Sequence, residues 1–237
     1  MRLSRRQVLA AGGGGLLAGL AGCSGSSGDE SGGSTSVGGQ TSGDTPTLDS
    51  HPAGRAVDSQ PFHGPPPGEA SGTIVAFEDP SCPTCARFER ETVPQIRENL
   101  TDPGEATFVF RGVPVVYRWG QPATRALEAT FAADSDSVWT LAEQYFTNQS
   151  SFRGGSDDEV YETTETFLNG ETGVDGTAVV EAARAGEADA AVETDLSAGE
   201  DAGVPATPTL YLFRNGQLRT QIRGMVRYDV LAGALGF

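Results

Sequence analysis

Residues 73–85 read TIVAFEDPSCPTC, an apolar run that leads within a few residues to two cysteines in a CxxC arrangement. The apolar part, residues 73–77, is rich in β-branched side chains and predicts a buried strand. From Cys82 to Leu100 the apolar residues fall near helical spacing, which predicts a helix with a kink at Pro94. The sequence therefore places the cysteine pair where a strand ends and a helix begins.

This position gives the cysteine pair its predicted chemistry. Free backbone N–H groups and the helix dipole favour an anion at a helix N-terminus, here the Cys82 thiolate. Such placement lowers a thiol pKa from ~8.5 to ~3.5–7.5, and the thiolate is the nucleophile of thiol–disulfide exchange. Pro83 suits the first turn because it lacks an N–H that would have no partner there, and Cys85 lies one turn on, close enough to form a disulfide with Cys82. A structural disulfide would close a small loop that constrains the unfolded chain little, and a metal site lacks its other ligands, so a redox-active pair is predicted.

The remaining elements follow the order of an α/β fold. The patterns predict strands over 106–111, 209–213 and 217–223, helices between 121 and 202 with one of them over 179–192, and a closing helix over 227–235. Asn215-Gly216 is a strong signal for a two-residue hairpin. This order permits a β-α-β unit, a block of helices and a β-β-α unit around one mixed sheet.

Two motifs resemble a known family. Residues 77–85, FEDPSCPTC, with a proline-kinked helix behind them, resemble the DsbA-like branch of the thioredoxin superfamily. Residues 203–209, GVPATPT, resemble the cis-proline loop of that family, with Pro208 as the cis residue and Thr207 before it. The helical block at about 120–202 resembles the insertion that marks this branch. The resemblance covers roughly residues 55–237 and implies a thioredoxin fold with a helical insertion between the βαβ and ββα units.

The resemblance also implies an activity, that of a protein thiol–disulfide oxidoreductase. Cys82 would form a mixed disulfide with the substrate, and Cys85 would resolve it. The implied active-site loop and substrate-binding positions are Pro83, Thr84, Thr207 and Pro208, the last two pairing with an extended substrate segment. No cofactor is expected besides the Cys82–Cys85 disulfide. The direction, whether oxidase, reductase or isomerase, stays open because it depends on the reduction potential of the pair.

One position departs from the family pattern. Many thioredoxin-fold enzymes carry a buried carboxylate six residues before the first cysteine, and this chain has Ala76 there. Strand alternation puts Glu78 on the face of Ala76 and Asp79 on the opposite face. Either acid could assist proton transfer to Cys85, or both could be solvated acids of an acidic protein.

The charge balance is strongly acidic, with 32 acidic residues against 16 basic ones and a net charge of −16. All the basic residues are arginine. The sequence has no broad basic footprint, which argues against a nucleic-acid partner. The absence of lysine favours the salt-adapted surface of a halophile over a binding site for cationic partners. Three cysteines and two histidines are too few for most zinc modules. His51 and His63 are interpreted as unrelated surface residues, and no metal site is predicted.

The first 49 residues are predicted to lie outside the fold. Ser4-Arg5-Arg6 before an apolar run resembles a twin-arginine export signal. Leu20-Ala21-Gly22-Cys23 resembles a lipoprotein box, so residues 1–22 are predicted to be a signal peptide and Cys23 the lipidated residue, with an ordinary signal peptide as the alternative. Residues 23–49, mostly Ser, Gly, Thr and Asp, predict a flexible tether. The domain over 50–237 is therefore expected outside the cytoplasm, anchored to the outer face of the membrane.

Taken together, the sequence predicts a membrane-tethered thiol–disulfide oxidoreductase. Its expected partners are exported proteins with thiols or disulfides, and a membrane redox partner. The alternative is a redox-silent thioredoxin-fold lipoprotein that binds peptides or partner proteins. A copper-delivery role would need a wider cysteine pair and a histidine in the folded core, and the sequence offers neither.

Overall fold

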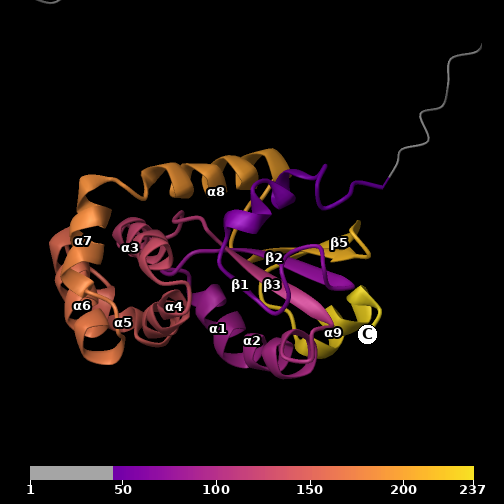
Figure 1. The fold of residues 1–237 in the computed structure, drawn as a ribbon, viewed down its shortest axis with the longest axis horizontal. Helices are drawn as coiled ribbons and strands as arrows, with labels where there is room; N and C mark the ends of the chain where they lie inside the picture. The colour runs from indigo at the N-terminus through magenta and orange to yellow at the C-terminus, as the bar shows by residue number, and fades with distance from the viewer. Residues whose placement is uncertain (1–44) are drawn as a thin grey trace, which may run out of the picture. The chain divides into compact units, whose positions relative to one another are not determined.

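The computed structural model describes residues 45–237, in which five strands form one sheet of order β1-β3-β2-β4-β5. The strands are β1 (Phe62–His63), β2 (Gly72–Glu78), β3 (Ala106–Gly112), β4 (Thr209–Arg214) and β5 (Gln217–Arg223). Strand β2 is parallel to β3 and antiparallel to β4, and β4 is antiparallel to β5. The two predicted units thus share one mixed sheet, with β2 at its centre (Figure 1).

The helices fall into two groups. One group flanks the sheet and consists of α1 (Pro83–Glu91), α2 (Val93–Ile96) and α9 (Tyr228–Leu235). The other lies between β3 and β4 and consists of α3 (Gly120–Ala133), α4 (Ser137–Thr147), α5 (Gln149–Phe152), α6 (Asp157–Glu171), α7 (Gly176–Ala185) and α8 (Asp189–Ala202). Figure 1 shows α3 to α7 gathered beside the sheet and α8 running back to it. The predicted fold class, with a helical insertion over 120–202, is confirmed.

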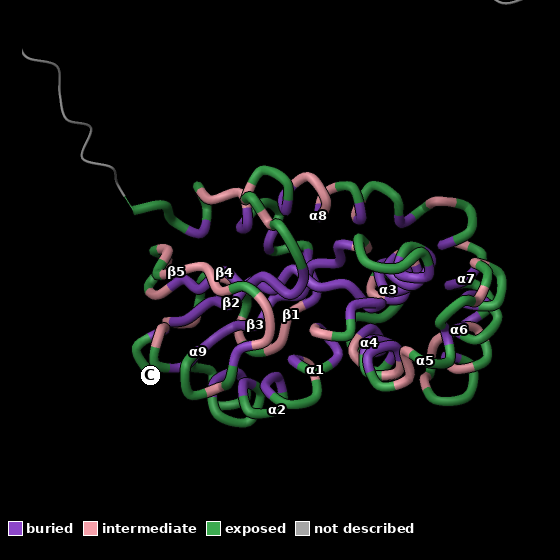
Figure 2. The backbone as a smooth tube through the Cα atoms, turned by 180° about the vertical axis from the view of Figure 1, so that it is seen from behind, coloured by how far each residue is buried: buried purple, intermediate pink, exposed green. Residues whose placement is uncertain are grey.

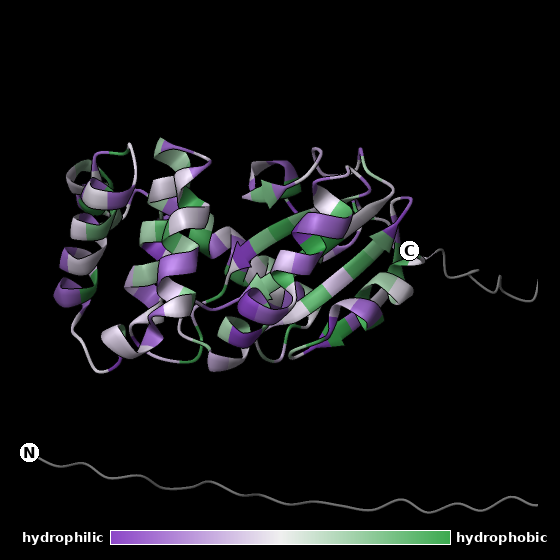
Figure 3. Ribbon diagram, turned by 90° about the horizontal axis from the view of Figure 1, so that it is seen from below, coloured by the Kyte–Doolittle hydropathy of each residue, from purple (hydrophilic) through white to green (hydrophobic). Residues whose placement is uncertain are grey.

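The central strand β2 is buried on both faces, which explains its unbroken apolar sequence. Ile74 and Ala76 face a core formed with α1, α2 and α9, whereas Val75 and Phe77 face a core formed with α8 and the N-terminal segment. Figure 2 shows the strands as buried backbone, and Figure 3 shows the hydrophobic residues along them. Cys82 and Cys85 therefore follow a fully buried strand at the centre of the sheet.

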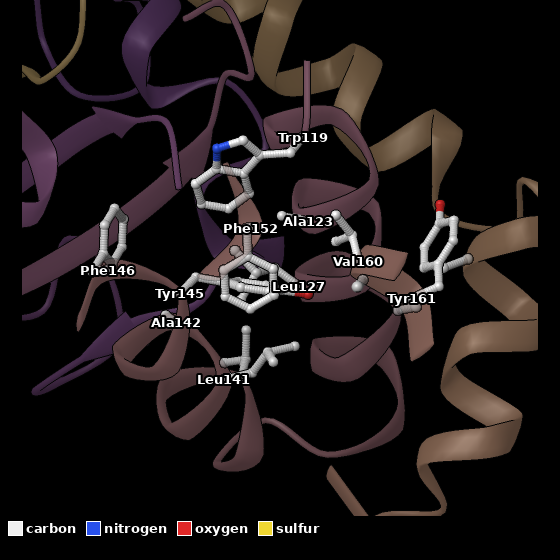
Figure 4. Packing of buried hydrophobic residues seen from close by; sticks show 14 of the residues in the cluster. Trp119, Ala123, Leu127, Leu141, Ala142, Tyr145, Phe146, Phe152, Val160 and Tyr161 are labelled. Carbon is white, nitrogen blue, oxygen red and sulfur yellow. The ribbon is translucent and has the colours of Figure 1, made fainter. Parts of the chain in front are cut away.

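A separate core fills the helical insertion. Trp119 stacks on Phe152 with ring centroids 5.2 Å apart, and Tyr145 meets the same Phe152 edge-on at 5.1 Å. These three rings lie together in Figure 4. Cys82 and Cys85 belong to the same buried cluster. The cysteine pair therefore lies at the boundary between the sheet and the insertion.

Two predicted helices are divided in the structure. The helix predicted from Cys82 to Leu100 ends at Glu91 and restarts at Val93, because Pro94 cannot donate a helical hydrogen bond. It then continues as a π-helical turn over Arg97–Thr101. The region predicted to be helical over 179–192 is divided between two helices, since Gly186 adopts a left-handed conformation (φ 80°) that ends α7 before α8 begins.

The fold begins earlier than the predicted boundary at residue 50. Leu48 is buried, its N–H donates to the Gly216 carbonyl at 2.8 Å, and the Leu218 N–H donates to the Pro46 carbonyl at 2.8 Å. The composition of the whole stretch assigned residues 46–49 to the tether. They instead pack along β5, because Leu48 is apolar and because their backbone pairs with that of residues 216 and 218. The predicted signal peptide over 1–22, the predicted lipidation site Cys23 and most of the predicted tether lie outside the described residues. Within 45–237 no helix has the length and apolar character needed to cross a membrane.

Candidate active site

Cys82 caps the N-terminus of α1. Its backbone is extended (φ −77°, ψ 120°), its N–H donates to the Asp79 carbonyl at 2.9 Å, and its carbonyl accepts from the Ala86 N–H at 3.1 Å. Pro83 occupies the first turn, as predicted, and both cysteines are free thiols. The Cys82 side chain is therefore held at the end of the helix where backbone N–H groups lack helical acceptors.

Hydrogen-bond donors around Cys82 favour its thiolate. A hydrogen bond from the Cys85 thiol makes the largest contribution, and the Thr207 side chain and the backbone N–H groups of Thr84 and Cys85 add to it. Burial works in the opposite direction, and the net result lowers the pKa of Cys82 to about 5. Cys82 is therefore a thiolate at neutral pH.

Cys85 has the opposite character. Its side chain is completely buried. Burial is the main cause that raises the pKa of the Cys85 thiol well above its ordinary value, and the hydrogen bond to Cys82 and the charge of Glu78 raise it further. The pair therefore combines a thiolate with a thiol that stays protonated.

The second predicted motif lies against Cys82. The Thr207–Pro208 peptide bond is cis, as the resemblance implied. The Cys82 Sγ lies 3.3 Å from the Thr207 carbonyl oxygen, to which it donates when it is protonated. The Thr207 hydroxyl is buried and has no hydrogen-bond partner within residues 45–237, which leaves it available to the thiolate. Thr207 and Cys82, 125 residues apart in sequence, are thus brought together.

Asp79 is a buried anchor for a loop next to the site. One carboxylate oxygen accepts from the Ser81 N–H at 2.7 Å and the Ser81 hydroxyl at 2.6 Å. The other accepts from the N–H groups of Val115 and Val116 at 2.8 and 2.7 Å. The interpretation of Asp79 as a solvated surface acid is therefore wrong, because both oxygens are committed to holding the 113–117 loop against the cysteine loop.

Glu78 is also completely buried, so the same interpretation is wrong for this residue. Neither of its carboxyl oxygens accepts from an N–H or hydroxyl group of the described residues. The neighbour in hydrogen-bonding reach is the carboxyl group of half-buried Glu89 on α1, and two carboxyl groups can bond only by sharing a proton. Burial, followed by the charge of Glu89, raises the pKa of Glu78 well above its usual range, and burial raises the pKa of Glu89 to about 7. A protonated carboxyl group is therefore held beside the cysteines.

Uncharged loops surround Cys82. Residues 80–84, 113–117 and 203–208 contain no charged side chain, in a chain with 20% charged residues. Val115, Val116 and Tyr117 leave 62, 42 and 44% of their surface exposed. The uncharged run VPVVY, which begins two residues after the strand predicted over 106–111, is the sequence signal for this surface.

The two histidines have separate surroundings, as their interpretation as unrelated residues requires. His51 accepts from the Ala53 N–H at 3.1 Å through Nδ1 and caps a short 3-10 helix, Pro52–Gly54. His63 is only half exposed because it stacks on Trp139 with centroids 3.8 Å apart. Burial, aided by the charge of Arg97, lowers the pKa of His63 to about 4. His63 is thus a packed residue and not the simple surface residue predicted.

The pKa of Cys82 can be tested by alkylation. With a pKa of about 5, roughly nine-tenths of Cys82 is ionised at pH 6, against about 0.3% of a free cysteine. Low-pKa thiolates are weaker nucleophiles, so a net rate advantage of roughly tenfold is expected at pH 6. Thiolate absorbance at 240 nm, followed against pH in the reduced protein, should show a transition near pH 5. A single transition above pH 8 would contradict the assignment.

Known proteins resemble this chain in sequence and in fold. The family described as thioredoxin matches residues 61–221. The disulfide bond formation protein D of Bacillus subtilis is 28% identical over 161 residues, which cover 66% of this chain and 69% of that protein. The crystal structure of oxidised BdbD from Bacillus subtilis superposes with a TM-score of 0.65 at 22% identity, covering 81% of this chain and 98% of the other. That of alpha-DsbA1 from Wolbachia pipientis gives 0.61 at 17% identity, covering 75% and 89%.

Proposed function

The chain belongs to the thioredoxin family and is a protein thiol–disulfide oxidoreductase, and we propose that it works as an oxidant that transfers its Cys82–Cys85 disulfide to exported proteins. The observation that carries this proposal is the opposite shift of the two thiol pKa values, with Cys82 lowered to about 5 and Cys85 raised. The relative named disulfide bond formation protein D supports the same direction.

The low pKa favours oxidation of the substrate because it stabilises the reduced enzyme. The disulfide form has no thiolate and gains nothing from the donors around Cys82, so the equilibrium shifts toward the dithiol. Because the folded-state pKa lies below the unfolded one, this stabilisation is complete above about pH 8.5 and is lost as the pH falls through about 5. At neutral pH the oxidised protein is therefore a disulfide donor.

The transfer follows two exchange steps. A substrate thiolate attacks the Cys82 sulfur, the Cys82–Cys85 bond breaks, and Cys85 leaves with the bonding electrons and takes up a proton. A second substrate thiolate then attacks the substrate sulfur of the mixed disulfide, and Cys82 leaves as a thiolate. The substrate is oxidised by two electrons to a disulfide, and the enzyme is reduced to the dithiol.

The proton for Cys85 comes from Glu78 in this proposal. Asp79 has both oxygens occupied by hydrogen bonds, whereas Glu78 is protonated and lies close enough to Cys85 for its ionised form to raise the pKa of that thiol. Glu89, which is half-buried, connects Glu78 to the surface. Glu78 thus takes the place of the carboxylate that Ala76 cannot supply.

The setting of the reaction is part of the proposal. The twin-arginine pattern and the box ending at Cys23 support export and anchoring at the outer face of the membrane. The uncharged, partly apolar loops around Cys82 suit an unfolded segment of an exported protein more than a charged folded surface. The enzyme must be reoxidised after each transfer, so the proposal includes a membrane redox partner that restores the Cys82–Cys85 disulfide.

Two measurements test this function. The oxidised chain should accelerate disulfide formation in a reduced client protein in concentrated salt. Equilibration with a glutathione series should give a reduction potential between about −120 and −180 mV, in the range of known disulfide donors and isomerases. A potential near −270 mV, together with no acceleration of client oxidation, would show a reductant instead.

A further inference from the structure

A side chain of the helical insertion donates hydrogen bonds to the backbone of the cysteine loop, residues 80–84. The amide nitrogen Nε2 of Gln149 donates to the Pro80 carbonyl at 2.8 Å and to the Cys82 carbonyl at 2.9 Å. Gln149 lies 69 and 67 residues from its two acceptors, on the short helix α5. The two N–H groups of one amide therefore hold the carbonyl groups of the residues before and after Ser81.

The position of Gln149 is itself fixed. Asn148, directly before it, donates to the Gln144 side chain at 2.7 Å and caps the end of α4. Phe152, at the end of α5, is buried and packs on Trp119 in the insertion core. The glutamine amide is thus held from both sides by the insertion and reaches out to the cysteine loop.

The two carbonyl groups matter for the charge on Cys82. The Cys82 carbonyl belongs to the reactive residue and also accepts the first hydrogen bond of α1, from Ala86. A carbonyl oxygen is the negative end of a dipole, and near a thiolate it opposes the negative charge. The Gln149 amide places positive hydrogens on both carbonyl oxygens, which offsets their unfavourable effect on the thiolate. The same hydrogen bonds fix the extended backbone that places the Cys82 Sγ beside Thr207.

We propose that Gln149 is a positioning residue for disulfide exchange, through which the helical insertion sets the geometry and the charge environment of Cys82. The effect differs between redox states because the thiolate exists only in the reduced protein. Loss of the two hydrogen bonds therefore destabilises the reduced form more than the disulfide form. The consequence for client oxidation rests on the proposed function. The expected effect on the Cys82 pKa rests on the two hydrogen bonds of Gln149 alone.

The test compares two substitutions at this position with a matched control. Gln149→Met keeps the length and removes both donors, whereas Gln149→Glu also places a negative charge against the two carbonyl oxygens. Ser150→Glu adds the same charge one residue further on, at an exposed position of α5. Each variant is examined for its Cys82 pKa by thiolate absorbance, its equilibrium with glutathione, and its thermal unfolding in both redox states.

We expect Gln149→Met to shift the glutathione equilibrium away from the reduced enzyme by about three- to tenfold, the range that corresponds to an ordinary hydrogen bond. The Cys82 pKa should rise by about half to one unit in parallel. Gln149→Glu should exceed both effects, and Ser150→Glu should stay within twofold of wild type. If Gln149→Met and Gln149→Glu lower the unfolding temperature equally in both redox states and leave the pKa and the equilibrium unchanged, Gln149 is only structural.

The outcomes also separate this inference from the proposed function. Should the wild-type chain fail to oxidise clients, the proposed function falls, while the Cys82 pKa in the two Gln149 variants still decides the role of this residue. Should the wild type oxidise clients and the variants keep the wild-type pKa, the inference about Gln149 falls alone.

Discussion

Replacing Cys82 by serine is expected to reduce client oxidation to the uncatalysed rate. Serine has no sulfur, so the Cys82–Cys85 disulfide that the substrate thiolate attacks cannot form. Cys85 cannot take over, because it is completely buried and its raised pKa keeps it protonated. The loss should therefore be complete in oxidative refolding of a reduced client, with the far-UV circular dichroism spectrum unchanged because serine is nearly isosteric.

Cys85→Ser is the matched control for this loss. The variant keeps the Cys82 sulfur at the N-terminus of α1, and the serine hydroxyl at position 85 can still donate to the thiolate, so a client disulfide can still be attacked. Without Cys85 the mixed disulfide with the client has no internal thiol to release it and should accumulate. Non-reducing electrophoresis measures this adduct. Accumulation with Cys82→Ser in place of Cys85→Ser would reverse the assigned roles, and full activity of Cys82→Ser would remove the site altogether.

The cysteine pair was predictable because its signal is local. A strand, two cysteines and a helix follow one another within thirty residues, and the helix N-terminus determines which sulfur is ionised. The Thr207–Pro208 loop has no such local link to Cys82 and was placed by resemblance alone. In the structure, the antiparallel pairing of β4 with β2 brings the loop to the Cys82 sulfur. Local sequence patterns predict the strands but not which strands pair.

The surroundings of the pair were harder to predict. Alternation correctly put Glu78 on the face of Ala76, but its burial depends on α1 packing across that face and bringing Glu89 to it. The role of Asp79 depends on a loop more than thirty residues away. Gln149 reaches the cysteine loop across almost seventy residues. A single polar residue in a helical region has no periodicity that distinguishes such a contact from a solvated side chain.

A buried ion pair joins the insertion to the sheet on the opposite face. Arg111 on β3 is completely buried, and its Nη1 donates to Asp195 on α8 at 2.7 Å. The second oxygen of Asp195 accepts from the Gly112 N–H at 2.8 Å, while Arg111 Nη2 donates to the Arg55 carbonyl. Burial raises the pKa of Asp195 to about 7 and that of nearby Glu128 to about 8, so Asp195 is the carboxyl group that ionises first beside Arg111. The pair therefore ties β3, α8 and the N-terminal segment together.

Asp195→Ala is expected to lower the free energy of unfolding by about 3–5 kcal/mol, since it leaves the Arg111 charge buried without a partner. This is a large share of the ~5–15 kcal/mol that stabilises a typical domain. Urea unfolding at fixed salt measures the change. Asp201→Ala, on the same helix, removes an exposed pair with Arg55 and should cost at most about 1 kcal/mol.

The double variant Arg111→Met with Asp195→Leu separates the cost of an unpaired charge from the loss of a favourable contact. Apolar replacement of both partners removes the desolvation penalty together with the attraction, and such exchanges are often neutral or stabilising. The double variant should therefore recover most of the stability that Asp195→Ala loses. If it were as unstable as the single variant, the pair would contribute a specific attraction that packing cannot replace. If Asp195→Ala cost no more than Asp201→Ala, the Arg111 charge would have to reach solvent by a local rearrangement of α8, the helix that leads into the Thr207 loop.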